Sequence, residues 1–514
     1  MSENLNRRTF LKSLGMGSVS LGLMSVFSCK KKINQKPNVV YILADDLGYG
    51  DVSCLNGESK LDTGNIDRIA QKGMIFTDAH SGSAVCTPTR YGILTGRYCW
   101  RSQKKHGVLS GYSPHLIENG RLTAASMLKQ RGYNTACIGK WHLGWDWQRK
   151  GPKPRDVDFT KPVTHGPVTN GFDYFFGFCG SLDMAPYVYV ENNRVTALPD
   201  RITRNDDPKA FWREGPTGAD FEHEQVLPKL TEKAVEYIGI QEQGKPFFFY
   251  FPLPAPHTPI LPTKKFRGKS KTNEYGDFVL QVDDTVGKIL DALERTGLED
   301  NTIVILTSDN GCSPRADFDE LDEFGHDPSY VFRGHKADIF EGGHRIPFIV
   351  QWPAGVKPGS ICDDPVCLTD LMATMADITG FQLPDNAGED SVSILPDLLG
   401  TAKDPVREAI VHHSVNGSFS IRQGKWKLEL CPGSGGWSDP KPAVAKKNNL
   451  PKVQLYDLIQ DIGEQVNLQA EHPKVVERMT ALLQSYVDTG RSTPGKPQQN
   501  NGDVDIFYGP NRIK

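Results

Sequence analysis

The residues of this chain that could carry chemistry follow directly after apolar segments, where predicted strands end. Four segments run into acidic, basic or histidine side chains: 39–44 into Asp45 and Asp46, 135–138 into Lys140 and His142, 247–251 into His257, and 303–307 into Asp309 and Asn310. If the four strands are parallel, these side chains meet at one edge of a sheet, where open α/β folds bind ligands. A single Asp after a strand is more often a turn former or a helix cap, so the convergence is the signal.

The oxygen-bearing members of this set indicate a metal site. Asp45, Asp46, Asp309 and Asn310 offer only carboxylate and amide oxygens, which suit Ca²⁺ or Mg²⁺ and are poor ligands for zinc. Three carboxylates at one edge would repel one another without a cation between them. We therefore expect a bound divalent cation, either Ca²⁺ or Mg²⁺.

Lys140 and His142 are predicted to face the same site. They are two residues apart, so in an extended segment both side chains point to one side. An ammonium group beside a metal suits a divalent oxyanion, and an imidazole there suits proton transfer. Taken singly, each would be an ordinary surface or packing residue.

The second signal is Cys86 in the sequence Cys86-Thr87-Pro88-Thr89-Arg90. Pro88 fits the first position of a helix and Thr87 its cap, which predicts that Cys86 lies at a helix N-terminus. Backbone N–H groups there attract an anion, including one that develops on a nucleophile. Arg90, one turn into the helix, could hydrogen-bond an oxyanion or the nucleophile itself. The pattern fits equally well an ordinary helix that starts after a buried cysteine.

The elements that must position these residues alternate between short apolar strands and amphipathic helices from about residue 36 to 400. The apolar runs fit strands buried on both faces, and they lie at 39–44, 135–138, 247–251, 303–307 and 348–352. One helical stripe consists of Phe278, Val282, Val286, Ile289 and Leu293, with Gly297 as its stop. This alternation predicts an α/β sheet covered by helices on both faces.

Two other stretches differ from this α/β pattern in composition and in the spacing of their apolar residues. Residues 145–230 are rich in aromatic residues, Pro and Gly, and they form either a surface insertion or part of a substrate pocket. Short runs at 409–413, 419–422, 426–430 and 453–457 predict antiparallel strands, and Pro473 opens a helix with Val476, Met479, Leu483 and Tyr486 on one face. We therefore divide the chain into residues 1–35, an α/β domain over 36–404 and a smaller α+β domain over 405–514. Within the last, 432–451 is either a mobile hairpin loop or a lid.

Length and composition limit the number of domains and the classes of partner only loosely. The 514 residues, 38% of them hydrophobic, are enough for two or three domains. Lys plus Arg number 59 against 62 for Asp plus Glu, so no basic face calls for a nucleic-acid partner. The ten cysteines include no CxxC pair. Cys362 and Cys367 are the closest pair for a disulfide, and most others except Cys86 are predicted to be small buried apolar residues.

The first 35 residues resemble an export address. Residues 6–12 place paired arginines ahead of the apolar stretch 14–28, as in a twin-arginine signal, and that stretch is shorter than the roughly 20 residues of a spanning helix. Residues 26–29 resemble the box at which bacterial lipoproteins are cleaved and acylated on Cys29; the alternative is a plain signal peptide. We expect an exported bacterial protein that is periplasmic or held at a membrane by a lipid on Cys29, with the cell surface as an alternative.

The motifs as a set resemble the type I, formylglycine-dependent sulfatases. Cys86-x-Pro88-x-Arg90 resembles the sequence in which that family oxidises a cysteine to an aldehyde. The other blocks follow in the family's order: Asp45-Asp46, Gly139-Lys140-Trp141-His142, His257, Ser308-Asp309-Asn310-Gly311, and Lys336 ahead of Glu341-Gly342-Gly343-His344-Arg345. The resemblance covers about residues 37–350 and implies an alkaline-phosphatase-like fold: a large mixed, mostly parallel sheet sandwiched by helices, with a smaller C-terminal domain built on an antiparallel sheet.

The resemblance also implies a role for each residue. Formylglycine at position 86, made by a sulfatase-maturing enzyme, would be hydrated, and one hydroxyl would attack sulfur. The expected cation is Ca²⁺ ahead of Mg²⁺, and its expected ligands are Asp45, Asp46, Asp309, Asn310 and residue 86. Arg90 and Lys140 would steady the hydrate and the sulfate. His257 and Lys336 would protonate the departing alcohol, and His142 would take the proton of the second hydroxyl.

The substrate class that this resemblance favours is a sulfated carbohydrate, with Asp183, Tyr187, Trp212 and His223 as candidate sugar contacts. One alternative is a formylglycine-type phosphodiesterase or phosphonate hydrolase. Another is a glycan-binding lipoprotein that has lost its chemistry. Thr89 departs from the Ser or Ala that is commoner in the family, but the core motif is intact, so we expect maturation of Cys86 to proceed.

Overall fold

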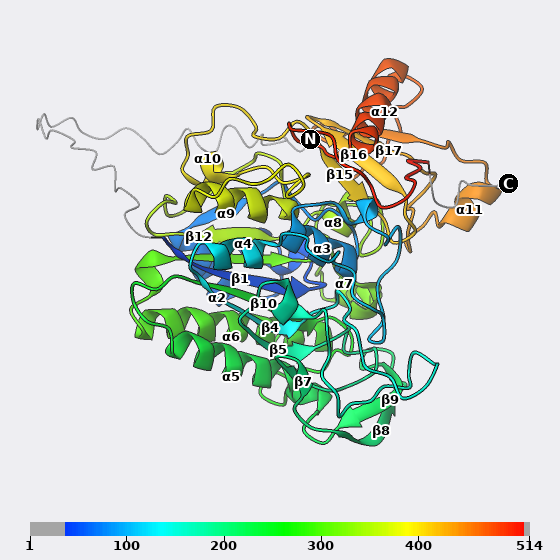
Figure 1. The fold of residues 1–514 in the computed structure, drawn as a ribbon. Coiled ribbons are helices and arrows are strands. Elements are labelled where there is room, and N and C mark those ends of the chain that lie inside the picture. The colour runs from blue at the N-terminus through cyan, green and yellow to red at the C-terminus, as the bar shows by residue number, and fades with distance from the viewer. Residues whose placement is uncertain (1–35, 508–514) are drawn as a thin grey trace, which may run out of the picture. The chain divides into compact units, whose positions relative to one another are not determined.

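The structure, a computed structural model, describes residues 36–507 of the chain. Its main element is a ten-stranded sheet of order β13-β2-β12-β11-β1-β10-β4-β5-β6-β7 (Figure 1). The strands are β13 (Ser360–Cys362), β2 (Met74–Phe76), β12 (Phe348–Gln351), β11 (Thr302–Ser308), β1 (Asn38–Asp45), β10 (Phe247–Pro256), β4 (Asn134–Lys140), β5 (Tyr174–Phe178), β6 (Val190–Glu191) and β7 (Arg194–Val195). The predicted signal and tether over 1–35 lie outside the described residues.

Most strand pairs in this sheet are parallel. β1 pairs in parallel with β10 and β11, and β4 pairs in parallel with β10 and β5. β12 is antiparallel to β11 and to β2. The predicted run at 348–352 is therefore a strand, but a reversed one, since a buried apolar run does not encode strand direction. The sheet is mixed and mostly parallel, which confirms the predicted fold class.

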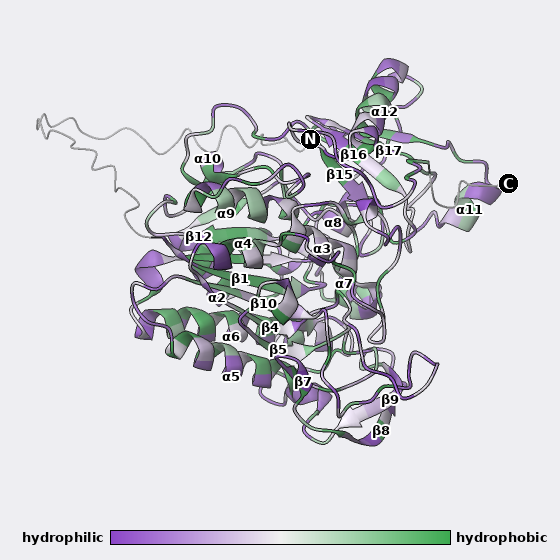
Figure 2. Cartoon of the chain, in the orientation of Figure 1, coloured by the Kyte–Doolittle hydropathy of each residue, from purple (hydrophilic) through white to green (hydrophobic). Residues whose placement is uncertain are grey.

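Helices cover both faces of the sheet (Figure 1). One face carries α2 (Gly64–Lys72), α5 (Val226–Gly239) and α6 (Glu274–Arg295), and the other carries α3 (Cys86–Thr95), α4 (Ala124–Gln130) and α9 (Leu371–Thr379). Along β1, Val40 and Ile42 pack into one apolar cluster while Tyr41 and Leu43 pack into the other, because successive side chains of a strand point to opposite faces. Figure 2 shows the resulting concentration of apolar residues along the central strands.

The predicted stripe of α6 is confirmed as a core-facing surface. Phe278, Val282 and Val286 are buried in it. The helix begins where the Asn273 side chain accepts hydrogen bonds from two backbone N–H groups, and it ends at Thr296, just before Gly297, whose φ is +66°.

The C-terminal part forms a separate antiparallel sheet of order β15-β16-β17-β18. Its elements are β15 (Ile410–His413), β16 (Phe419–Gln423), β17 (Trp426–Glu429), β18 (Gln454–Asp457) and the covering helix α12 (Pro473–Asp488). Met479 and Leu483 of α12 are fully buried in its core. The predicted small antiparallel sheet is confirmed, while the domain boundary near residue 404 stays a prediction. Residues 432–451 connect β17 to β18 and contain the short helix α11 (Pro442–Lys447).

The remaining elements are short. They are β3 (Ala79–His80), β14 (Val366–Cys367), β8 (Pro199–Asn205), β9 (Trp212–Gly218), α7 (Phe318–Glu323), α8 (Glu341–His344), α10 (Leu395–Leu398) and the 3₁₀ turns η1 (Tyr49–Asp51), η2 (Cys99–Arg101), η3 (Pro167–Asn170), η4 (His223–Gln225), η5 (Glu299–Asn301), η6 (Pro314–Ala316) and η7 (Leu368–Asp370). Every cysteine in residues 36–507 is a free thiol, Cys362 and Cys367 included. Over the same range, no helix combines the length and apolarity needed to cross a bilayer.

Candidate active site

The strands predicted to end at the site are parallel neighbours, and their carboxyl ends bring the acidic residues together. Ala44 of β1 lies opposite Ser308 of β11, and the N–H of Asp309 donates to the Ala44 carbonyl (3.1 Å). Asp45, Asp46 and Asp309 therefore lie side by side, with carboxylate oxygens within 4.8 Å of one another. All three are buried.

The backbone is held in unusual conformations at this edge. Asp46 has a φ of +66° and His142 a φ of +53°, values that are uncommon for residues other than glycine and that cluster at functional sites. Gly311 ends the Asp309-Asn310 turn where a Cβ would lie 1.8 Å from the Gly342 carbonyl oxygen. Only glycine permits that approach, which brings the Asp-Asn turn against the Glu-Gly-Gly-His segment.

These oxygens form a site suited to a hard cation. Asp45 Oδ1 and Asn310 Oδ1 are buried and have no hydrogen-bond partner among the described residues, and such unpaired acceptors are costly. Burial and the charge of Asp45 raise the pKa of Asp309 to about 7, because the clustered carboxylates oppose one another's ionisation. A divalent cation would relieve both conditions, so the donor set fits Ca²⁺ or Mg²⁺.

Each carboxylate also has a basic partner: Asp309 has Arg90 (Nη2–Oδ2, 2.7 Å), Asp45 has Lys140, and Asp46 has Lys336 (Nζ–Oδ2, 2.7 Å). Burial opposes the charge of Asp45, but the neighbouring cations, Lys140 foremost, hold its pKa below the ordinary value. Burial likewise opposes a charged Lys336, yet Asp46 raises its pKa. The basic side chains thus balance the carboxylates, and a divalent cation bound among them would make the site positive, which suits an anionic substrate.

Ser181 belongs to this constellation and was not predicted. Its Oγ lies 3.2 Å from Lys140 Nζ and 3.3 Å from a ring nitrogen of His257. It follows β5, whose Phe178 lies opposite Lys140 of β4. The aromatic run 174–178 is the signal that could have located it, as a further strand ending at the same edge.

Cys86 is the first residue of α3, which confirms its predicted place at a helix N-terminus. The predicted cap is wrong: Val85 occupies the cap position, and Thr87 lies in the first turn, where its hydroxyl donates to the His142 carbonyl (3.0 Å). Cys86 Sγ lies within 4.8 Å of an Asp45 oxygen and of a His257 nitrogen. Burial raises the pKa of the thiol to about 11, so unmodified Cys86 is a weak nucleophile at neutral pH.

The two site histidines differ in their hydrogen bonds. His142 Nε2 lies 2.8 Å from the Leu109 carbonyl, which only accepts, so Nε2 carries the proton and Nδ1 is left with a buried, unpaired lone pair. Burial, reinforced by Lys140, lowers the pKa of His142 well below its ordinary value, so the ring is neutral. His257 Nε2 lies 3.7 Å from Asp46 Oδ2. Burial, followed by the charge of Lys336, lowers the pKa of His257 as well.

Comparison with known proteins accounts for this constellation. Residues 37–381 match the family described as Sulfatase. The chain belongs to the sulfatase family. It is therefore a sulfuric ester hydrolase, and the predicted family and enzyme class are confirmed.

Relatives of this sulfatase match it over most of its length. It is 36% identical to the N-acetylgalactosamine-6-O-sulfatase of Bacteroides thetaiotaomicron, over 90% of this chain and 97% of the relative. It is 29% identical to the human N-acetylgalactosamine-6-sulfatase, over 91% and 88% of the two chains. A solved structure of a 6S-sulfatase, from work on glycosaminoglycan metabolism in Bacteroides thetaiotaomicron, superposes with a TM-score of 0.78 at 36% identity, covering 88% of this chain and 99% of that one.

The constellation of this sulfatase opens into a pocket of about 450 Å³. Cys86, His142, His257 and Lys336 are among its lining residues. Other lining residues are apolar and charged side chains from distant segments: Val108, Asp183, Met184, Phe211, Arg213, Arg315, Val415 and Trp437. Segment 145–230 is thus part of the pocket, and so is the β17–β18 connection, through Trp437.

Of the four predicted sugar contacts, only Asp183 lines this pocket. The rings of Trp212 and His223 stack at 4.0 Å, and Tyr187 packs against His223 at 4.6 Å. The Tyr187 hydroxyl donates to the Arg213 carbonyl (2.6 Å). These three aromatic residues therefore support the pocket wall from behind. Four further lining residues were not predicted: Phe211, Arg213, Arg315 and Trp437. Of these, only Arg213 could have been found from the sequence, because it lies beside the candidate Trp212.

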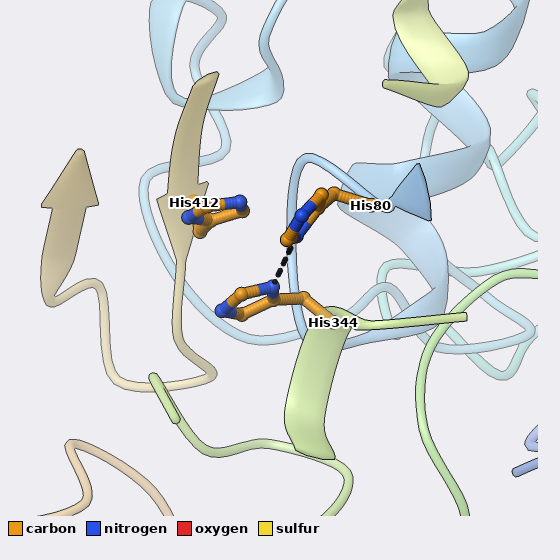
Figure 3. Close-up of side chains that lie close together, drawn as sticks. All are labelled: His80, His344 and His412. Atoms are coloured by element: carbon orange, nitrogen blue, oxygen red, sulfur yellow. Dashed lines mark hydrogen bonds between the residues drawn. The ribbon is translucent and has the colours of Figure 1, made fainter. Parts of the chain in front are cut away.

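Three histidines of this sulfatase also lie close together, but their rings are arranged differently from metal ligands (Figure 3). His80, His344 and His412 are fully buried, and the His344 and His412 rings lie parallel, 3.7 Å apart at 11°. An imidazole lone pair lies in the plane of its ring, so two stacked rings do not aim at one ion. The three histidines form a packed aromatic contact among β3, α8 and β15.

Proposed function

We propose that this sulfatase removes sulfate from sulfated glycans, using a nucleophile made from Cys86. The observation that carries the proposal is the floor of the pocket, where Cys86 lies within 4.8 Å of Asp45 and His257, beside the three carboxylates. The two N-acetylgalactosamine-6-sulfatases that it resembles support a glycan substrate. We take a 6-sulfated N-acetylgalactosamine unit as the first substrate to test.

The nucleophile of this proposal is the hydrate of formylglycine, made by a sulfatase-maturing enzyme from Cys86. Two observations support it: the Cys-x-Pro-x-Arg sequence is intact, and the raised pKa of the thiol makes unmodified Cys86 a poor nucleophile. Cys86 is 2% exposed. Maturation must therefore act on the chain before it folds.

The cation of this proposal is Ca²⁺, with Mg²⁺ as the alternative, held by Asp45, Asp46, Asp309, Asn310 and residue 86. When bound, it supplies positive charge that lowers the pKa of a coordinated hydroxyl and neutralises sulfate oxygens. Arg90 fixes the Asp309 carboxylate through two hydrogen bonds to Oδ2 (3.0 and 2.7 Å). Ca²⁺ is favoured because it accepts several protein oxygens directly, whereas Mg²⁺ keeps most of its waters.

Proton transfer in this proposal is divided between the two sides of the pocket. His142 Nδ1, unpaired and neutral, accepts the proton of the hydroxyl that does not attack sulfur. Lys336 and His257 line the same pocket and would donate a proton to the departing oxygen, which leaves as the alcohol. Lys140, held between Asp45 and Ser181, orients the sulfate group.

The test is sulfate release by enzyme produced with and without a sulfatase-maturing enzyme. We expect turnover of 4-nitrophenyl sulfate and of N-acetylgalactosamine 6-sulfate only after maturation, with mass spectrometry showing conversion of residue 86. Cys86→Ala should abolish turnover. Faster hydrolysis of 4-nitrophenyl phosphate than of the sulfate would instead favour a phosphohydrolase, and unmodified Cys86 in protein from the native cell would favour an inactive glycan-binding protein.

We further propose that the chain is exported by a twin-arginine route and held at a membrane by a lipid on Cys29. The paired arginines and the sequence Val26-Phe27-Ser28-Cys29 support this. A route for folded proteins also suits an enzyme whose nucleophile must be made before folding. Cell fractionation should find the wild type with membranes and Cys29→Ser in the soluble periplasmic fraction; equal distribution of the two would contradict the lipid.

A further inference from the structure

The connection between β17 and β18 places an exposed aromatic side chain at the catalytic pocket. Trp437 is 43% exposed, and it lines the pocket together with Cys86 and Lys336. All eight tryptophans lie within the described residues, and Trp437 is the only one of them that is neither buried nor half-buried. Within residues 36–507 its indole has no hydrogen bond, ring stacking or cation–π contact. Its apolar face is therefore open to a ligand in the pocket.

One buried carboxylate fixes the position of Trp437. Asp338 Oδ1 accepts hydrogen bonds from the backbone N–H groups of Trp437 (2.7 Å) and Ser438 (3.0 Å). Its Oδ2 accepts from the backbone N–H of His335 (2.9 Å), the residue before Lys336. Asp338 thus holds together the segment that carries Trp437 and the segment that carries the proposed acid Lys336. The indole has a defined place relative to the chemistry, as a specific recognition group must have.

Backbone hydrogen bonds join the same segment to the start of α3 and to the small antiparallel sheet. The N–H of Ala337 donates to the carbonyl of Ala84 (2.8 Å), just before α3. The N–H of Val415, in the β15–β16 turn, donates to the Ala337 carbonyl (3.0 Å). The N–H of Ile339 donates to the Ser434 carbonyl (2.8 Å), in the β17–β18 connection. Two loops of the small sheet are therefore held in register with the helix that begins at the nucleophile position.

The chemistry of this wall decides which part of a substrate it can contact. Val415 and the face of the Trp437 indole are uncharged and apolar, so they do not replace the water around a sulfate group. A pyranose ring, in contrast, has a face of C–H groups that packs against an aromatic surface, while its hydroxyls stay at the edge. The pocket of about 450 Å³ has room for a sugar ring beside the sulfate.

We propose that Trp437 is the platform on which a sugar ring of the sulfated substrate stacks. The C–H face of the ring lies on the indole while the sulfate group lies at residue 86. The inference rests on the proposed glycan sulfatase function and deepens it, because it assigns recognition of the sugar to a loop of the C-terminal sheet.

The first experiment measures whether a ligand covers the indole. Acrylamide quenches the fluorescence of exposed tryptophans, and the inactive Cys86→Ala variant with Ca²⁺ keeps the substrate intact. N-acetylgalactosamine 6-sulfate should reduce this quenching in Cys86→Ala and leave it unchanged in Cys86→Ala/Trp437→Phe. Inorganic sulfate, which has no ring, should protect neither. Cys86→Ala/Trp426→Phe is the matched control and should still show protection, because Trp426 lies in the same sheet but does not line the pocket.

Kinetics of the matured enzyme separate stacking from a merely structural role. Trp437→Ala should lower kcat/KM for N-acetylgalactosamine 6-sulfate about 10-fold, mainly through KM, and Trp437→Phe should recover most of that loss because it keeps an aromatic face. Inhibition by inorganic sulfate should be equal in the wild type and both variants. A parallel loss of sulfate inhibition in Trp437→Ala would show that the loop only supports the site, and would overturn the inference.

Two further outcomes would also reject the sugar platform. One is protection by the sugar sulfate that persists in Cys86→Ala/Trp437→Phe; the other is protection of Trp437 by 4-nitrophenyl sulfate but not by the sugar sulfate. Both leave sulfate-ester hydrolysis intact. The proposed glycan function itself fails if the matured wild type hydrolyses 4-nitrophenyl sulfate but neither binds nor hydrolyses any sugar sulfate, so the two failures are distinguishable.

Discussion

At the scale of single residues, the tautomer of His142 determines what it can do. The Leu109 carbonyl accepts a hydrogen bond from the Nε2–H group of His142. A backbone group therefore fixes the tautomer of the ring and leaves the lone pair on Nδ1 free. Burial lowers the pKa of the ring and keeps it neutral. A neutral imidazole with one committed and one open nitrogen is a general base at neutral pH.

Removing that base should slow turnover without preventing the first release of alcohol. For His142→Gln we expect kcat on 4-nitrophenyl sulfate to fall about 10²- to 10⁴-fold. A burst of 4-nitrophenol of about one equivalent per active site should precede the slow phase, as expected when a later step is blocked. His472→Gln, far from the pocket, is the control and should keep wild-type kcat. A loss of burst and turnover together would assign His142 to the attack step instead.

The unpaired oxygens of Asp45 and Asn310 predict that cation binding stabilises the fold. Chelation should abolish sulfate release and lower Tm by several degrees, and added Ca²⁺ should reverse both, since a ligand at 100 times its Kd contributes about 2.7 kcal/mol. Asn310→Ala should weaken the Ca²⁺-dependent rise in Tm. Asp284→Asn, which changes a surface carboxylate, should not. An unchanged Tm and full activity in chelator would contradict the assignment of this site.

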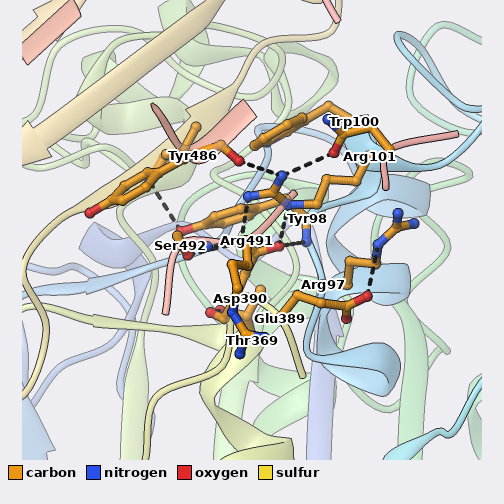
Figure 4. Close-up of polar contacts among 12 residues, drawn as sticks. Arg97, Tyr98, Trp100, Arg101, Thr369, Glu389, Asp390, Tyr486, Arg491 and Ser492 are labelled. Atoms are coloured by element: carbon orange, nitrogen blue, oxygen red, sulfur yellow. Dashed lines mark hydrogen bonds and ion pairs between the residues drawn. The ribbon is translucent and has the colours of Figure 1, made fainter. Parts of the chain in front are cut away.

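At the scale of elements, a buried ion pair ties the C-terminal segment to the catalytic part of the chain (Figure 4). Arg101 of η2 donates to both oxygens of Asp390 (2.8 Å each) and to the carbonyl of Tyr486 in α12 (2.8 Å). The Ser492 hydroxyl donates to the same carboxylate (2.8 Å). Three segments far apart in sequence thus share one carboxylate, and removing it leaves Arg101 buried without a counter-charge.

We therefore expect Asp390→Ala to lower the free energy of unfolding by about 3–5 kcal/mol, the range for breaking a buried pair. Thermal or urea denaturation of the two proteins measures the difference. Asp284→Ala is the comparison: it removes the exposed pairs with Lys265 and Lys288 and should cost about 1 kcal/mol or less. Similar values for the two variants would mean that Asp390 contributes no more than a surface pair.

At the scale of the whole molecule, buried neutral histidines make the fold sensitive to acid. Burial lowers the pKa of His223 and of His413 to about 3, and that of His80 to about 4. The unfolded chain binds protons to these groups near pH 6.5, so it holds more protons than the folded state below that pH. Stability should therefore be full above about pH 6.5 and fall as the pH drops towards 3.

The contribution of a single histidine to this acid sensitivity can be measured. Each such histidine contributes a slope of up to about 1.4 kcal/mol per pH unit. In urea denaturation between pH 7 and 4, His413→Asn should show a shallower decline than the wild type by about that amount. His472→Asn, in contact with Trp426 at the surface of the small sheet, should leave the decline unchanged. Equal slopes for wild type and His413→Asn would refute the assignment.

The sequence by itself determined the fold class, the family and the charged groups that meet at the end of the central strands. Asp45 and Lys140 are the last residues of their strands, and His257 and Asp309 directly follow theirs, so strand order and local motif place them together. Cys86 begins a helix with its own local signal. These signals are local, because each depends only on the few residues at the end of a strand or the start of a helix.

Tertiary structure alone decided three features: which residues form the pocket wall, the direction of β12, and which carboxylate pairs with which basic side chain. Asp183, Arg213, Arg315 and Trp437 come from loops whose meeting depends on long-range packing, and none is marked by a periodic pattern. The reversal of β12 is equally invisible, because an apolar run is the same read in either direction. The acidic and basic groups of the site are therefore predictable from local motifs, whereas the rest of the pocket wall is assembled from distant segments only when the chain folds.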